Sequence, residues 1–262
     1  MRADRCAVAT ATILPVSVAT LTLALAATAG AAPPPAITWG SATNMSGDSD
    51  VSTSGTLKYA YNVGASGVSS VSDNGVTFAP YAFPALLSFT NTVTSGGVSF
   101  VESDGTLWSN NSQGTASGAG LSADYKSMLS SIGGATNPGT ITVTLGNLAS
   151  GTQYQLQVWV NNSSNGSVPN TGDPISSVIL GSGANQVTLD ANTTNSAGGV
   201  GQFVLGTFTA SGSSQTFTLN GSGGMPVINA FQLRDLTPIP GPGGAALAAI
   251  IGAMLPAGRR RR

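Results

Sequence analysis

Short segments in which apolar and polar residues alternate cover most of the chain between residues 57 and 236. Clusters of Gly, Asn and Ser separate these segments. A period of two between turn residues is typical of β-strands with one buried face. We expect strands over Leu57–Val63, Val76–Ala79, Val98–Glu102, Ile141–Leu145, Thr152–Asn161, Ser177–Leu180, Gln186–Leu189, Gly201–Thr209, Gln215–Leu219 and Ile228–Leu236.

One segment, Ser122–Ile132, has helical spacing instead. Its apolar residues recur every three or four positions, and Ser122 can cap the first turn. These apolar residues are Leu121, Tyr125, Met128, Leu129 and Ile132. Many strands and one short helix predict an all-β fold, an antiparallel β-sandwich of the jelly-roll type. Because no segment of 20–50 residues repeats, we do not expect a solenoid or a propeller.

The tight connection Asn147–Gly151 predicts that the strands on either side of it form a hairpin. The stretch Leu148–Val160 resembles the central hairpin of galactose-binding-like jelly rolls, and Leu219–Leu233 resembles their closing strand. Those folds include malectin-like domains and many carbohydrate-binding modules. The resemblance implies a jelly roll and, as an expectation, a sugar ligand.

The N-terminus has the pattern of a signal peptide. Arg2 and Arg5 precede an apolar, Ala-rich stretch from Cys6 to Ala29, and Ala29-Gly30-Ala31 offers small residues for cleavage. We therefore predict that residues 1–31 are removed, that the protein is exported, and that residues 32–237 form the β-sandwich domain.

The C-terminus, residues 238–262, combines a proline-rich breaker, an apolar segment and a basic cluster. Pro238, Pro240 and Pro242 precede the apolar run Gly243–Leu255. The chain ends at Arg259, Arg260, Arg261 and Arg262. At 1.5 Å per residue the apolar run spans about 20 Å, which is short for a bilayer core of about 30 Å. The arginines favour the cytoplasmic side, so the segment is expected to hold the exported protein in the membrane.

This tail resembles the PEP-CTERM sorting signal, which exosortase-type enzymes read and remove from bacterial surface proteins. It departs from that pattern because Ile239 or Gly241 stands where Glu is usual. Gly243-Gly244 also resembles the GlyGly-CTERM signal, which a rhomboid-type protease processes. The resemblance implies a sorting protease of exosortase type as partner, transient membrane anchoring, and a final location at the cell surface or in the extracellular matrix.

Composition narrows the chemistry of the domain. The single cysteine, Cys6, belongs to the predicted signal peptide, and the chain has no histidine. The usual general base near neutral pH and the commonest zinc ligand are therefore missing. Only Lys58, Lys126 and Arg234 are basic between residues 32 and 242, against nine acidic residues. Such an acidic domain is not expected to bind nucleic acid.

Trp159 is the candidate ligand-binding residue. Alternation places it with Gln155, Gln157 and Asn161 on the face opposite the expected core. A ring among amides suits a sugar, because the ring packs on C–H groups and the amides bond hydroxyls. In the alternative, a loop or the short helix covers this face and buries the ring. Trp108 could line a loop site or be a packed loop anchor.

Trp39 is expected in the core. Two pairs of acidic residues are candidates for calcium binding and for glycoside hydrolysis. Asp48 and Asp50, two residues apart in a Gly-flanked loop, resemble the opening of a calcium-binding loop. The alternative is a solvated turn, and no other cofactor is expected. Glu102 and Asp104 share one face of a strand, whereas a glycosidase needs two carboxylates across a cleft.

We therefore expect a non-catalytic, surface-retained β-sandwich that binds carbohydrate. A structural component of an extracellular matrix or envelope without a discrete ligand is the alternative, and a glycan-active enzyme is the third candidate.

Overall fold

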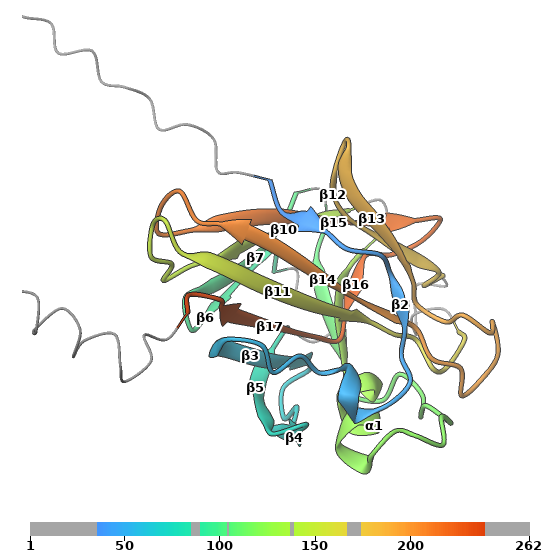
Figure 1. Ribbon diagram of the computed structural model, residues 1–262. Coiled ribbons are helices and arrows are strands. Elements are labelled where there is room, and N and C mark those ends of the chain that lie inside the picture. Colours follow the sequence, from blue (N-terminus) through green and yellow to red (C-terminus); the bar gives the residue numbers. More distant parts are fainter. Residues whose placement is uncertain (1–35, 85–89, 104, 137–138, 167–173, 239–262) are drawn as a thin grey trace, which may run out of the picture. The chain divides into compact units, whose positions relative to one another are not determined.

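The computed structural model describes residues 36–84, 90–103, 105–136, 139–166 and 174–238 (Figure 1). The predicted signal peptide lies outside the described residues, and so does the C-terminal segment after Pro238, including Pro240, Pro242 and Arg259–Arg262. Predictions for those segments stay predictions.

Most described elements are strands, in agreement with the alternating sequence. In the first half they are β1 (Thr38–Trp39), β2 (Thr43–Asn44), β3 (Thr56–Gly64), β4 (Val71–Asp73), β5 (Val76–Ala82), β6 (Thr92–Ser95), β7 (Val98–Glu102) and β8 (Leu107–Asn110). In the second half they are β9 (Ile132–Ala135), β10 (Thr140–Leu145), β11 (Gln153–Val160), β12 (Ser177–Ser182), β13 (Asn185–Asp190), β14 (Gln202–Thr209), β15 (Gln215–Ser222), β16 (Val227–Ile228) and β17 (Ala230–Asp235). The helix α1 spans Ala123–Ser130, and a 3₁₀ turn, η1, spans Asp48–Asp50.

The strands form two large sheets and one small one. The first sheet has the order β1-β14-β11-β17-β3-β5-β4, with β2 also paired to β14. The second has the order β13-β12-β15-β10-β7-β6, and β16-β9-β8 make the small sheet. Pairing is antiparallel except between β3 and β5. From β10 to β15 the chain crosses repeatedly between the two large sheets, as in a jelly roll, so the predicted antiparallel β-sandwich is confirmed.

The predicted hairpin between β10 and β11 is wrong. Strand β10 pairs with β7 and β15, whereas β11 pairs with β14 and β17 in the other sheet. The turn around Gly151, with φ +81°, therefore passes from one sheet to the other. A turn signal specifies a reversal of the chain, but it does not decide which strands become neighbours.

The main core lies between the two large sheets, as the alternation predicts. Inward residues of β11, such as Leu156 and Val158, belong to the same buried cluster as Val143 of β10. Phe100 and Phe231, one from each sheet, have ring centroids 5.6 Å apart in an edge-to-face arrangement. Burying the apolar faces of both sheets is the main source of stability for such a fold.

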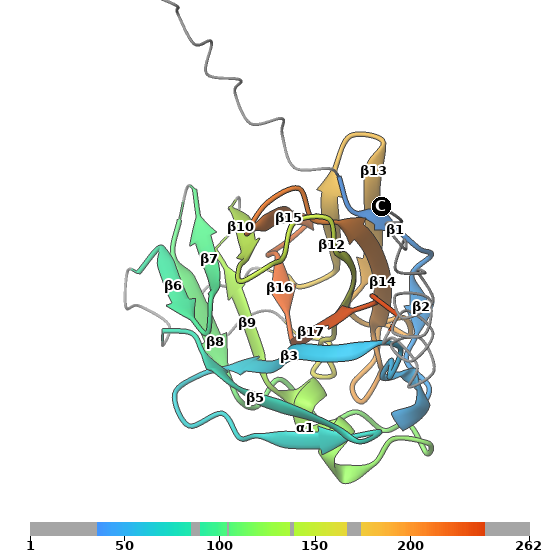
Figure 2. The ribbon, with the colours of Figure 1, turned by 60° about the vertical axis from the view of Figure 1, so that its left-hand side comes forward.

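A second core covers the outer face of the first sheet. Helix α1 begins where expected, because Ser122 Oγ accepts a hydrogen bond from Tyr125 N at 3.0 Å. Its buried residues Tyr125, Met128 and Leu129 belong to a second cluster that also contains Trp159. Helix α1 packs against β4, the strand that pairs with β5 (Figures 1 and 2). The polar-looking face of β11 is therefore covered by protein.

Candidate functional site

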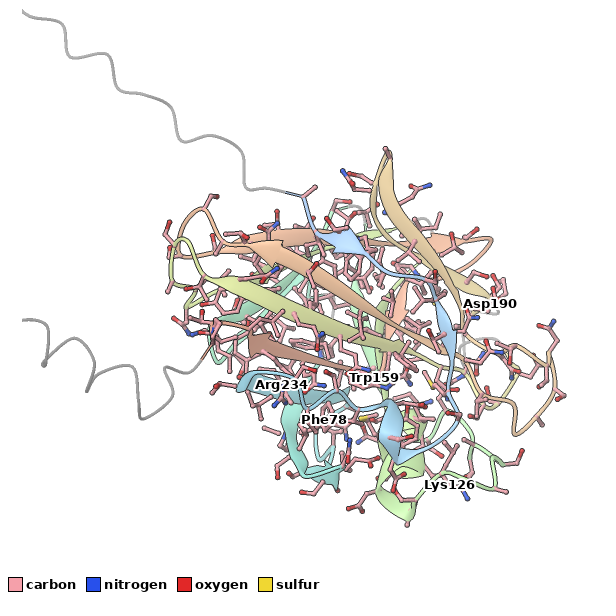
Figure 3. All side chains as sticks on the ribbon, viewed as in Figure 1. Phe78, Lys126, Trp159, Asp190 and Arg234 are labelled. Atoms are coloured by element: carbon pink, nitrogen blue, oxygen red, sulfur yellow. The ribbon has the colours of Figure 1, made fainter. Side chains whose placement is uncertain are left out.

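Trp159 does not lie on an exposed surface, so the predicted sugar-binding platform there is wrong. Its side chain is 0% exposed. Phe78 packs edge-to-face on it, with ring centroids 5.5 Å apart; both side chains are labelled in Figure 3. The indole Nε1 donates a hydrogen bond to Tyr125 Oη at 2.9 Å. The alternative from the sequence, burial under the short helix, is what the structure shows.

The three amides predicted beside Trp159 have structural roles. Segment 45–55, here called the strap, crosses the outer face of the sheet and is bound by side chains of the sheet strands. Gln157, which is fully buried, donates to Asp50 O at 2.7 Å and accepts from Ser52 N at 2.9 Å. Gln155 Oε1 accepts from the Ser52 hydroxyl. The alternation predicted that these amides face solvent, but they bond the strap instead.

Asn161 directly follows β11 and is also fully buried. Its Nδ2 donates to Leu129 O at 2.9 Å, and its Oδ1 accepts from Gly201 N at 2.9 Å. It therefore holds the C-terminal end of α1 and the start of β14, and it is not available to a ligand.

Trp108 is a core residue. It lies on β8, is 1% exposed and belongs to the main core cluster, which agrees with a packed anchor and excludes a wall of an open site. Its Nε1 is buried, and the described residues offer it no hydrogen-bond acceptor.

Asp48 and Asp50, which the sequence placed at the opening of a calcium-binding loop, accept hydrogen bonds from protein N–H and O–H groups in the structure. Asp50 accepts from the backbone N–H groups of Ser46 and Gly47 and from Tyr125 Oη, at 2.7, 3.1 and 3.2 Å. Asp48 Oδ1 accepts from Ser122 N at 3.0 Å. Across the described ranges no three acidic side chains are grouped to hold a metal ion. The aspartates join the strap to α1.

The best candidate site is a pocket at the edge of the sandwich beside Trp39. Figures 1 and 2 show β1 next to the β12–β13 hairpin, where the two sheets meet. The pocket has a volume of about 210 Å³. Its lining comes from β1, β12, β13 and β15 and their flanking residues, namely Ala36, Ile37, Trp39, Gly181, Ser182, Asn185, Gln215, Thr216, Phe217 and Thr218.

Trp39 is half-buried, so its expected place in the core is only partly right. One face of its surroundings is apolar, because Phe217 lies edge-to-face at 5.8 Å. Trp39 pairs with Gly206 of β14, where an added Cβ would lie 2.6 Å from Trp39 Cε3 and from Ile37 Cγ2. The absence of a side chain at position 206 leaves room for the indole on the sheet.

Polar groups around the Trp39 pocket are uncharged. Thr218 Oγ1 donates to Gly181 O at 3.0 Å, which fixes the start of the β12–β13 turn. Gln215 is 2% exposed and its Nε2 donates to Thr216 O at 3.0 Å. Its Oε1 is buried, and no donor among the described residues reaches it. An unsatisfied buried acceptor is unfavourable by about 1–3 kcal/mol.

No strong pattern in the sequence indicates this pocket. Strand β1 has only two residues, too few for a pattern, and Gln215 lies on an inward strand position that alternation assigns to an apolar residue. A buried glutamine within an alternating strand was the one available hint.

No protein-family model and no curated protein matches this chain. A solved Bacteroides uniformis β-glucuronidase 2, covalently bound to cyclophellitol-6-carboxylate aziridine, aligns with a TM-score of 0.41 and 13% identity. A second Bacteroides uniformis β-glucuronidase structure gives a TM-score of 0.43 and 11% identity. Each alignment covers 68% of this chain and 18% of the glucuronidase chain.

A structure of carbohydrate-binding modules from the β-sandwich superfamily aligns with a TM-score of 0.17 and 14% identity, over 77% of this chain and 99% of that one. The chain spans less than a fifth of the length of either glucuronidase chain. All three scores lie below 0.5, so the description of the fold depends on the strands and their pairing.

The helix in the described part of the chain is too short and too polar to cross a membrane.

Proposed function

We propose that this protein is a non-catalytic carbohydrate-binding β-sandwich and that the Trp39 pocket is its ligand site. The observation that supports this proposal most is the half-buried indole beside uncharged polar groups at the sheet edge. Indole faces pack well on the C–H face of a sugar ring, while hydroxyls of the sugar bond amides and hydroxyls of the protein.

Size and charge of the pocket favour one neutral sugar unit. A volume of about 210 Å³ is below the roughly 300–1,000 Å³ of pockets for drug-sized ligands. No residue that lines the pocket is ionisable near neutral pH. An acidic sugar would lose its hydration without gaining a basic partner, so a neutral sugar is preferred.

The same lining supports a binding role over hydrolysis. Glycosidases use two carboxylates on either side of the scissile bond, and the residues lining this pocket include none. Glu102, considered above as half of a carboxylate pair, is 1% exposed on β7, and Asp104 lies outside the described residues.

The test is glycan binding by the wild type and by Trp39→Ala. We expect the wild type to retain neutral glycans on an array and to bind the best of them in calorimetry. Loss of a central aromatic contact weakens binding by about 2 kcal/mol or more, so Trp39→Ala should lower the affinity at least about thirtyfold. Gln186→Ala, an exposed change on β13 outside the pocket, is the matched control.

Two results would contradict the proposal. If the wild type retains no neutral glycan, the protein fits the structural alternative, a matrix or envelope component without a discrete ligand. If Trp39→Ala binds as well as Gln186→Ala, the sugar site lies elsewhere on the sandwich.

Export and surface retention belong to the same proposal and are supported by the two ends of the sequence. Cleavage after Ala31 and removal of the tail beyond Pro238 would leave the β-sandwich outside the cell. Mass spectrometry of the protein recovered from cell fractions tests this. Replacing Arg259–Arg262 with serines should reduce retention at the surface, whereas unchanged retention would argue against the sorting signal.

A further inference from the structure

Asp73 is a buried carboxyl without a hydrogen-bond donor. It ends β4 just before the Asn74-Gly75 turn and is 3% exposed. Both carboxylate oxygens are buried and have no partner of hydrogen-bonding geometry among the described residues. Val71 and Val76, on either side of it in the hairpin, belong to the second core. A carboxylate in such a place is strongly destabilised in its charged form.

Three elements meet at this carboxyl, here called the Asp73 junction. The strap bonds the β4–β5 hairpin through Asn74 Nδ2, which donates to Val51 O at 2.8 Å. The strap also bonds α1 through Asp48, which accepts from Ser122 N. The hairpin bonds α1 through Ser72 N, which lies 3.4 Å from Asp124 Oδ2. Changes at the junction therefore act on all three elements.

The charged groups that act on Asp73 are all acidic. Asp48 and Asp50 come from the strap and Asp124 from α1. Burial is the largest cause that raises the pKa of Asp73, Asp48 is the next, and the pKa reaches about 6. The Asn74 backbone acts in the opposite direction and lowers the pKa, by more than Asp124 or Asp50 raises it. Tyr125 also faces the junction, but burial raises its pKa, so it remains neutral across the relevant range.

We propose that the Asp73 junction is a proton-dependent latch, which closes the strap and α1 over Trp159 when Asp73 is protonated and loosens them when Asp73 is ionised. A neutral carboxyl is not repelled by Asp48, Asp50 and Asp124, and it avoids the unfavourable free energy of a buried charge. An ionised one keeps both, and the nearest relief is solvent that enters between the strap and α1.

The direction with pH follows from the raised pKa. The closed form binds the Asp73 proton more tightly than an open form with the ordinary pKa of 3.8. The closed form therefore has its full advantage below about pH 4, loses it progressively as the pH rises to about 6, and loses nothing further above that. A difference of about two units corresponds to at most about a hundredfold change in the opening equilibrium.

Hydrogen exchange on the full chain tests this latch. Exchange of the strap and of residues 121–131 is measured at pH 4.5 and 7.5 and corrected for the intrinsic chemical rate. We expect opening to increase about 25-fold from pH 4.5 to 7.5 in the wild type, because an open form with the ordinary pKa of 3.8 is already mostly ionised at pH 4.5. In Asp73→Asn, which is always neutral, this increase should disappear. The exposed Asp190→Asn, whose position Figure 3 labels, should behave as the wild type.

Asp48→Asn provides a second reading if Asp73→Asn fails to fold. It keeps an oxygen for Ser122 N but removes the largest repulsion on Asp73, so the midpoint of the transition should move to lower pH. Strap exchange that does not depend on pH in the wild type would overturn the proposal. So would an unchanged midpoint in Asp48→Asn, or full pH dependence in Asp73→Asn.

Discussion

Replacing Arg234 tests how the strap is held on the sheet. Arg234 lies on β17, labelled in Figure 3, and is 6% exposed. Its Nε donates to Ser54 O at 2.7 Å, and its Nη2 donates to Thr53 O and Gly55 O, each at 3.1 Å. Its Nη1 donates to Gln232 Oε1 at 3.2 Å. Burial lowers its pKa, but arginine remains charged in proteins.

The magnitude depends on what replaces each bond. The carbonyls of Thr53, Ser54 and Gly55 belong to exposed residues, so water can take the place of the guanidinium there. Gln232 Oε1 is different, because Gln232 is 0% exposed and its acceptor would be left without a donor, at about 1–3 kcal/mol. Relief from burying a charge offsets part of the remaining loss. We expect Arg234→Met, which keeps most of the packing volume, to lower the free energy of unfolding by about 2 kcal/mol.

The assay is urea denaturation followed by tryptophan fluorescence, with proteolysis of the strap as a second measurement. The free energy of unfolding of Arg234→Lys should lie between those of wild type and Arg234→Met, because a single ammonium cannot reach both the strap carbonyls and Gln232 Oε1. If Arg234→Met unfolds within about 0.5 kcal/mol of wild type and its strap resists protease equally, the guanidinium does not hold the strap, and the reasoning fails.

Two further predictions concern the pocket and the core. Gly206→Ala should push the indole of Trp39 off β14, because the new Cβ would lie 2.6 Å from Trp39 Cε3. We expect thermal melting to show a destabilisation of about 1–3 kcal/mol and calorimetry to show weaker glycan binding. Binding equal to that of the wild type would show that this glycine does not set the position of the indole. Tyr81→Phe removes the buried bond from Tyr81 Oη to Val98 O at 2.8 Å and should lower the free energy of unfolding by about 1–3 kcal/mol in urea titrations, whereas no loss would mean that water replaces the hydroxyl.

Sequence reasoning identified the elements because their patterns are local. The inward face of β11 and the Ser122 cap follow from a few neighbouring residues, and both are present. The prediction of a hairpin between β10 and β11 was wrong because strand partners are decided by burial against residues far apart in the sequence. The sequence thus predicted the sandwich better than the order of its strands.

The site was harder to predict because it depends on what covers each face. Amides beside Trp159 suit solvent, a sugar or a polar strap equally well, and the strap is a Gly/Ser/Asp-rich segment without periodicity. Trp39 became accessible only because its strand lies at a sheet edge, opposite a glycine far along the chain. Neither fact is encoded in the residues next to the tryptophan.

The position of β17 in the first sheet has a consequence for the order of assembly. This last described strand pairs with β3 on one side and β11 on the other. During synthesis both neighbours are made long before it, and each keeps an unpaired edge until β17 arrives between them. Exposed edges of this kind invite pairing with other chains. A chain cut before residue 230 should therefore aggregate rather than form a smaller sandwich, and the two halves of the sheet are joined only by the end of the domain.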